Sequence, residues 1–252
     1  SSDLVSGMGA YPQGFDLKTI EEADTARKNR EQLYGGEAKN LDYFPVEKPS
    51  FEDNEFCTEA RAIYLNCAAV EAVDDYIDLA LEYDVNAAVV DIKDGILSYY
   101  SVVAEELNPY ANNVYYNSYS DYKYAIDALN AAGLYTIGRI VVFNDDYYAA
   151  DFPEECINDE SWPSAYSRNV WYYNVELAVE AVRAYGFNEI QFDYVRFPES
   201  AYSMSQNDAD FKNTYNEEKA EAIQNFLFYA CDVLHREGVY VSVDVFGECT
   251  DT

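Results

Sequence analysis

The stretch Gly186-Phe187-Asn188-Glu189-Ile190-Gln191-Phe192-Asp193-Tyr194-Val195-Arg196-Phe197-Pro198 decides the fold, because an apolar strand there ends in an acid, an arginine and a proline. Gly186 tolerates the left-handed cap of a preceding helix, and Pro198 cannot continue a strand ladder. The pattern predicts a buried parallel strand over about 188–197. Its side chains should alternate, with Gln191, Asp193 and Val195 on one face and Phe192, Tyr194 and Arg196 on the other.

The acid at the end of this strand has two interpretations. A carboxylate among apolar neighbours is costly to bury unless it is paired or used. Asp193 is therefore either half of a structural ion pair with an arginine or part of an active site. The second interpretation is favoured because α/β enzymes keep their sites at the carboxyl ends of their strands.

The charge of the chain restricts its partners. It has 252 residues with 47 acidic and 16 basic side chains, a net charge of −31. This charge repels phosphates and anionic lipid headgroups, so we expect no nucleic-acid partner and instead a neutral, cationic or protein partner. No run of apolar residues is long enough to span a membrane. Because the chain begins at Ser1 without a start methionine, we expect it to have been trimmed.

The cysteines and the single histidine do not indicate a metal site. The five cysteines show no CxxC spacing, and His235 lies apart from them near the end of a predicted helix. Two acidic loops, 144–146 and 207–210, carry oxygen ligands but do not fit a calcium-binding loop. We therefore expect no metal and no cofactor.

From Arg61 onward, strand patterns alternate with helix patterns, which is typical of a parallel sheet. Residues 1–56 precede them as an N-terminal arm and linker, with a helix over about 16–34 and a possible protein partner. The barrel domain is expected at 57–252. The expected strands are 61–66, 86–93, 134–143, 188–197 and 239–246, and the expected helices between them are 71–83, 121–132, 170–185 and 214–236.

The loops that follow the second, third and fourth strands are long, whereas the turns that lead into strands are short. This asymmetry is typical of a (β/α)8 TIM-type barrel, whose catalytic face is built from the loops after the strands. Five βα units are visible, whereas a closed barrel has eight. The chain is therefore predicted to be an α/β protein, either a truncated part of such a barrel or an open, doubly wound five-stranded sheet.

Four successive strands carry ionisable residues near their carboxyl ends: Asp91 and Lys93, then Arg139, then Asp193 and Arg196, then Asp244. In a parallel sheet these ends lie side by side, so their side chains should meet at one rim. Paired carboxylates at such a rim suit glycosidic cleavage, in which one acid stays ionised and the other stays protonated. Loop aromatics, including Trp162 and Tyr194, could stack on sugar rings. A network of structural salt bridges is the alternative.

Several motifs in this order resemble a bacterial family whose members are classed as glycoside hydrolases and are similar to α-amylase-like barrels. The motifs are Arg61-Ala62-Ile63-Tyr64, Val89-Val90-Asp91-Ile92-Lys93-Asp94, Gly138-Arg139-Ile140-Val141-Val142-Phe143, Trp171-Tyr172-Tyr173-Asn174, 191–198 and Ser242-Val243-Asp244-Val245-Phe246-Gly247. The resemblance covers about residues 60–247 and implies a barrel and a carbohydrate substrate. We expect a bacterial extracellular or cell-surface location. The resemblance also implies Asp193 as the nucleophile and Asp244 as the acid/base. Amylase-like enzymes use a glutamate in that second role, so Glu248 is a fallback.

Two functions follow from different classes. The first is a glycosidase that cleaves polysaccharides with Asp193 and Asp244, while the substrate is bound by Asp91, Lys93, Arg139, Tyr194, Arg196 and Trp162. The second is a non-catalytic carbohydrate-binding or protein-interaction module on the same scaffold. The separation of the two carboxylates and the release of reducing ends would distinguish the two functions.

Overall fold

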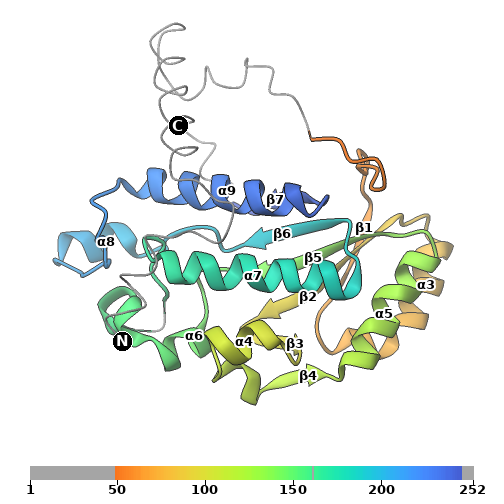
Figure 1. The fold of residues 1–252 in the computed structure, drawn as a ribbon, viewed down its shortest axis with the longest axis horizontal. Helices are drawn as coiled ribbons and strands as arrows, with labels where there is room; N and C mark the ends of the chain where they lie inside the picture. Colours follow the sequence, from red (N-terminus) through yellow and green to blue (C-terminus); the bar gives the residue numbers. More distant parts are fainter. Residues whose placement is uncertain (1–48, 161, 246–252) are drawn as a thin grey trace, which may run out of the picture.

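The protein is described by a computed structural model that places residues 49–160 and 162–245 (Figure 1). The helix expected over 16–34 and the fallback acid Glu248 lie outside the described residues. One seven-stranded sheet forms the centre of the described part. Its parallel strands, in the order in which they lie side by side, are β1 (Ala62–Leu65), β2 (Ala87–Asp94), β5 (Tyr135–Val141), β6 (Glu189–Asp193) and β7 (Tyr240–Val243).

These five strands follow the order of the chain without a reversal. A doubly wound sheet would reverse its strand order at a switch point, so that alternative does not fit. The long helices α3 (Val73–Glu82), α5 (Tyr119–Ala131), α7 (Arg168–Tyr185) and α9 (Lys219–Arg236) each pack against the next one in sequence. Figure 1 shows α7 and α9 lying along the strands. The described part is an arc of a (β/α) barrel, which confirms the expected truncated barrel.

The ends of α7 show why the sequence places a helix there. The hydroxyl of Ser167 accepts a hydrogen bond from the backbone N–H of Val170 and caps the first turn, and Gly186 ends the helix at φ 82°. Between these caps, apolar residues including Trp171 and Leu177 are completely buried against the sheet. Helix α7 is therefore fixed at both ends by local sequence and along its length by burial.

The turns leading into the four later parallel strands are short, as expected, and each contains a residue in the left-handed region. These residues are Asp84 (φ 54°), Gly133 (φ 79°), Gly186 (φ 82°) and Gly238 (φ 77°). Glycine adopts this region without steric cost, which explains three of the four residues. The tight turns fix the amino end of the sheet and leave the longer loops at the carboxyl end.

The longer loops contain structure that the sequence patterns did not predict. The segment after β2 turns back as β3 (Ile96–Tyr99), which pairs antiparallel with β2, and β4 (Tyr115–Asn117) then pairs parallel with β3. Short helices occupy the rest: α4 (Val102–Leu107), α6 (Asp146–Asp151), α8 (Ala201–Gln206), and the 3-10 turns η2 (Ala69–Ala72), η3 (Ala111–Asn113), η4 (Pro153–Glu155) and η5 (Ile157–Asp159). The loops that follow the strands therefore contain regular secondary structure of their own.

The fourth predicted strand ends earlier than expected. Strand β6 stops at Asp193, and Tyr194 adopts φ 53°, a left-handed conformation that costs a bulky residue energy. Because the chain turns there, Val195 is buried in the helix-side core with Phe192 instead of sharing the face of Asp193. The predicted alternation of side chains is therefore wrong beyond Asp193.

The two faces of the sheet differ in chemistry. The outer face carries completely buried apolar side chains such as Val90, Ile140 and Phe192, which pack in the core shared with the helices. On the inner face, the amino ends of the strands form a second apolar cluster, which Phe51 and Cys57 contact. The carboxyl ends of the inner face carry charged side chains instead, and this part of the sheet is the candidate site.

The segment around Phe51 is fastened to the amino end of the sheet. The Asn54 side-chain amide donates to the backbone oxygens of Asn188 (2.8 Å) and Gly238 (2.9 Å). The hydroxyl of Tyr240 donates to the backbone oxygen of Asn54 at 3.0 Å. These bonds hold residues 51–57 across the inner face at the end opposite the charged side chains. The predicted boundary between an arm at 1–56 and a barrel domain at 57–252 stays a prediction.

Candidate active site

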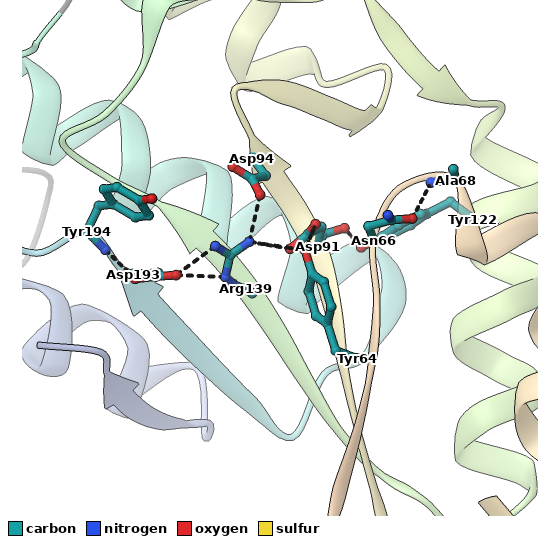
Figure 2. Close-up of polar contacts among 9 residues, drawn as sticks. All are labelled: Tyr64, Asn66, Ala68, Asp91, Asp94, Tyr122, Arg139, Asp193 and Tyr194. Atoms are coloured by element: carbon teal, nitrogen blue, oxygen red, sulfur yellow. Dashed lines mark hydrogen bonds and ion pairs between the residues drawn. The ribbon is translucent and has the colours of Figure 1, made fainter. Parts of the chain in front are cut away.

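One arginine on strand β5 connects three carboxylates at the carboxyl end of the sheet (Figure 2). Arg139 donates from Nε (3.0 Å) and Nη2 (2.6 Å) to Oδ2 of Asp193. Its Nη1 donates to Oδ1 of Asp91 at 2.7 Å and to Oδ2 of Asp94 at 3.1 Å. Burial lowers the pKa of Arg139, but hydrogen bonds to Asp91 and Asp193 outweigh it and raise that pKa above its usual value. The guanidinium is a permanent cation at the centre of the rim.

Asp91 is the most enclosed acid of this group, with a side chain only 2% exposed. The hydroxyl of Tyr64 donates to its Oδ2 at 2.6 Å, and the hydroxyl of Tyr122 donates to its backbone oxygen at 2.8 Å. Burial raises the pKa of Asp91, while the hydrogen bonds from Tyr64 and Arg139 oppose that rise. Asp91 is therefore fixed in place by partners on three sides.

Asp193 has both oxygens engaged but remains accessible, with a side chain 19% exposed. Its Oδ2 accepts from Arg139, and its Oδ1 accepts from the backbone N–H of Tyr194 at 2.6 Å. Tyr194, whose N–H makes this contact, has a left-handed backbone conformation (φ 53°). Strain of this kind is tolerated where surrounding contacts over-determine the backbone, which is common at active sites.

Asp244 lies one strand further along, just beyond β7. Its backbone N–H donates to the backbone oxygen of Phe192, and its Oδ1 accepts a long hydrogen bond from the amide of Gln191 at 3.3 Å. Burial and the neighbouring charge of Asp193 raise the pKa of Asp244, and the charge of Arg139 opposes that rise. Asp193 and Asp244 thus lie within electrostatic reach of each other but differ in their partners.

Lys93 does not join this rim. Its amine is 0% exposed and forms an ion pair with Oδ2 of Asp145 at 2.5 Å, over the ring of Tyr173 at 5.3 Å. The pairing of β2 with β5 shifts register between Asp91 and Lys93, which turns the two side chains apart. The predicted contact of Lys93 with substrate does not fit this geometry, because no ligand at the rim can reach a buried amine.

The three remaining predicted residues gather beside Asp193. The guanidinium of Arg196 lies 4.9 Å from the ring centre of Tyr194 and 5.3 Å from that of Trp162, and the two rings are 6.3 Å apart. Arg196 also lies 3.7 Å from a carboxylate oxygen of Glu199. Because these three side chains support one another, they form a compact aromatic and cationic wall on the β6 side of the rim.

Sequence reasoning missed Tyr64, Asp94 and Gln191, which also contact this group. A signal for Tyr64 was present, because it lies between Ile63 and Leu65 in a strand and must face away from their core. Asp94 and Gln191 gave no such signal, since charged and polar side chains near strand ends are common. Asp145 could not be linked to Lys93 from sequence, because the two are far apart in the chain.

Two further features of the described residues bear on function. In residues 49–160 and 162–245, no group of three or more His, Cys, Asp or Glu side chains is arranged so that it could hold a metal ion. Within the same ranges, every helix is too short or too polar to cross a membrane.

An arc of parallel strands with helices on one side and acids at its carboxyl rim is the arrangement of a (β/α)-barrel domain. Residues 62–252 match the family described as "Putative glycosyl hydrolase domain", and the chain belongs to that family. This match confirms the family resemblance that the motifs indicated. No curated protein has a sequence that matches this chain.

Solved structures agree with this fold. A hypothetical protein from Ruminiclostridium thermocellum is 34% identical, with a TM-score of 0.58 over 73% of this chain and 98% of that one. A Flavobacterium johnsoniae chitobiase is 11% identical (TM-score 0.58, 77% of this chain), and a Vibrio harveyi family 20 exo-β-N-acetylglucosaminidase is 15% identical (TM-score 0.55, 78% of this chain). The matches cover 32% and 36% of these two enzymes. At such low identity the two enzymes show the fold alone.

Proposed function

We propose that this chain carries the catalytic rim of a glycosidase that cleaves polysaccharides, with Asp193 and Asp244 as its carboxylate pair. The observation that carries the proposal is the difference between these two neighbouring acids. Asp193 is ion-paired with Arg139, whereas Asp244 has a raised pKa and, among the described residues, only a long side-chain hydrogen bond from Gln191. Glycosidic cleavage needs one carboxyl group that acts as nucleophile or base and a second that donates a proton, and the raised pKa of Asp244 suits it to the second task.

Each acid has a defined task in this proposal. Asp244 donates its proton to the glycosidic oxygen as the bond to the leaving sugar breaks. Asp193, oriented by its hydrogen bonds from Arg139, either attacks the anomeric carbon or takes a proton from the water that does so. Arg139 is a positioning residue, because its hydrogen bonds orient Asp193 and Asp91 without touching the reacting atoms.

The proposed substrate is a neutral or cationic polysaccharide. The net charge of −31 disfavours polyanions. Trp162, Tyr194 and Arg196 offer apolar ring faces and donors beside Asp193, and Asp91 completes the polar contacts around Arg139. The fold neighbours include a chitobiase and an exo-β-N-acetylglucosaminidase, so polymers of N-acetylglucosamine belong among the first substrates tested. An extracellular or cell-surface location is part of the same proposal.

The test is the release of reducing ends from chitin, glucan and xylan preparations. It compares the wild-type chain with Asp193→Asn and Asp244→Asn. We expect turnover by the wild type and a loss of at least about 100-fold in each variant, since each removes one half of the acid–base pair. Asp53→Asn, at an exposed aspartate near the opposite end of the sheet, is the control and should leave turnover unchanged. Equal turnover by all four proteins would refute the assignment of these two acids.

One observation favours a second function, a carbohydrate-binding module without catalysis. The same guanidinium binds Asp193 and Asp91, so Asp193 can be read as half of a structural ion pair. In that case chitin, glucan or xylan would bind to the wild type and to Asp193→Asn equally, and neither protein would release reducing ends. Binding with turnover that depends on Asp193 would exclude this alternative.

A further inference from the structure

We propose that Tyr64 forms a second sugar-binding subsite of this rim, on the far side of Arg139 from Asp193, so that the site binds an oligosaccharide rather than a single sugar. The proposal rests on the function proposed above, because it assigns the same rim to carbohydrate. It adds Tyr64, which the sequence patterns did not single out, to the residues that bind the substrate. It also sets a minimum number of sugar units for a ligand that fills the site.

The fold places Tyr64 on the inner face of the arc. Its neighbours Ile63 and Leu65 pack into the core between sheet and helices, so the side chain between them must face the other way. In the register of the sheet, Tyr64 pairs with Val89, which belongs to the inner apolar cluster. The Tyr64 residue is 48% exposed, and its side chain reaches up to the level of Asp91.

The ring is held in one orientation. Its hydroxyl donates to Oδ2 of Asp91 at 2.6 Å and accepts from Nη1 of Arg139 at 3.4 Å, and the guanidinium lies 5.6 Å from the ring centre (Figure 2). An exposed tyrosine would otherwise lose rotamer freedom when a ligand orders it. Because Asp91 and Arg139 have already ordered Tyr64, a sugar ring can stack on it at a lower entropic cost.

The chemistry of the hydroxyl also suits a sugar. Its proton is committed to Asp91, so the oxygen can act toward a ligand only as an acceptor. Sugar hydroxyl groups donate such bonds, whereas anionic groups do not. The apolar face of the ring and this acceptor together match a neutral sugar that lies flat across the end of β1.

The spacing of the strands sets the length of the ligand. Tyr64 lies on β1 and Asp193 on β6, with β2 and β5 between them. Three steps between neighbouring strands amount to roughly 14 Å at the usual separation. Trp162 and Tyr194 lie at the β6 end of this span. A single sugar cannot contact both ends, so a ligand that uses Tyr64 and the acids has several sugar units.

A purely structural role for Tyr64 predicts something different. If the tyrosine only anchored Asp91, its loss would disturb the rim equally for short and long ligands. The dependence of binding on ligand length therefore separates the two roles. Tyr83, which is 66% exposed at the end of α3, offers a matched substitution away from the rim.

The experiment measures binding of N-acetylglucosamine and glucose oligomers, from the monosaccharide to the hexasaccharide, by titration calorimetry. All proteins carry Asp193→Asn so that the ligands are not hydrolysed. We expect Tyr64→Ala to weaken hexasaccharide binding by about three- to tenfold, the size of one aromatic contact, with monosaccharide binding unchanged. In the parent protein, affinity should rise from the monosaccharide to the hexasaccharide. Tyr64→Phe should keep most of this rise, because it keeps the ring, and Tyr83→Ala should bind every oligomer as the parent protein does.

Three outcomes would overturn the proposal. They are an equal loss of binding at every length, no loss at any length, and no binding of any oligomer by the parent protein. Circular dichroism spectra and thermal unfolding midpoints show whether each variant is folded, and Tyr64→Phe keeps the test decisive if Tyr64→Ala unfolds. Failure of the function proposed above looks different. In that case oligomers bind with the expected dependence on Tyr64, but the wild-type chain with its native Asp193 releases no reducing ends.

Discussion

Two charged side chains of strand β2, Asp91 and Lys93, are used by the structure in opposite ways. Lys93 is sealed against helix α7 with Asp145 as its ionic partner, and both side chains are at most 1% exposed. Asp91, two residues earlier, shares Arg139 with Asp94 and Asp193 at a rim where Asp94 is 49% and Asp193 19% exposed. The Lys93–Asp145 pair is closed, whereas the Arg139 group is open to a ligand.

The contrast shows that position near a strand end does not by itself indicate a binding residue. The register shift between Asp91 and Lys93 decides which side chain faces the rim and which faces the helices. A closed pair mainly affects stability, because neither charge can be solvated if its partner is lost. An open group mainly affects ligands, because its charges can be contacted from solvent.

The largest effect is expected from breaking the closed pair. Lys93→Met leaves the Asp145 carboxylate buried without its cation, which should lower the free energy of unfolding by about 3–5 kcal/mol. Urea unfolding measures this change. The control is Arg61→Met, which breaks an exposed pair with Asp84 and should cost at most about 1 kcal/mol. Similar losses in the two variants would mean that the Lys93 pair is not closed as described.

An intermediate effect on stability, with a large effect on turnover, is expected from Arg139→Gln. The substitution removes the cation from Asp91, which keeps Tyr64 as its one side-chain partner within residues 49–160 and 162–245. It should lower the free energy of unfolding by about 1–3 kcal/mol. Turnover should fall far more than this loss of stability suggests, since Asp193 loses both hydrogen bonds from Arg139 and keeps the one from the backbone N–H of Tyr194. Full activity in this variant would contradict the role given to Arg139.

The smallest effect on stability is expected at Asp244. Its raised pKa means that the folded state favours the protonated acid, so the contribution of Asp244 to stability is fully present below the ordinary aspartate pKa and is lost as pH rises through the raised pKa. Asp244→Asn cannot ionise and avoids this loss. Its thermal midpoint should equal that of the wild type at low pH and lie slightly above it at neutral pH. A variant less stable than wild type at neutral pH would contradict the raised pKa.

The same titration should affect catalysis. If Asp244 supplies the proton for the leaving group, kcat/KM of the wild type should decline as pH rises through the raised pKa of this acid. The measurement is the profile of kcat/KM against pH for the wild type and for Gln191→Leu, which removes the amide beside Asp244. A shift of the decline at high pH in this variant would show that the decline reports the titration of Asp244. Identical profiles would point to another group as the acid.

Much of the fold could be predicted because it depends on local sequence. Alternating strand and helix patterns, together with Gly133, Gly186 and Gly238 in the short turns, located the five parallel strands and their helices. The hairpin from β2 to β3 was missed, although Gly95 at φ 65° allows its tight turn. A single glycine in a polar loop carries too little information to specify such a turn.

The site could be predicted only in part. Asp91, Arg139 and Asp193 were expected at one rim because parallel strands bring their ends together, and the structure joins them through Arg139. The orientation and burial of Lys93 could not be predicted, because they depend on a register shift and on an ion pair with Asp145, which is distant in sequence. The left-handed turn at Tyr194 depended on tertiary contacts that outweigh the preference of a bulky residue.

The most direct test of the account is the position of a bound oligosaccharide in crystals of Asp193→Asn grown with N-acetylglucosamine and glucose hexasaccharides. We expect sugar units that run across the carboxyl rim from Tyr64 to Trp162, with one glycosidic oxygen within hydrogen-bonding distance of Asp244. An oligosaccharide bound at the amino end of the sheet or on the helices, with this rim left empty, would contradict it.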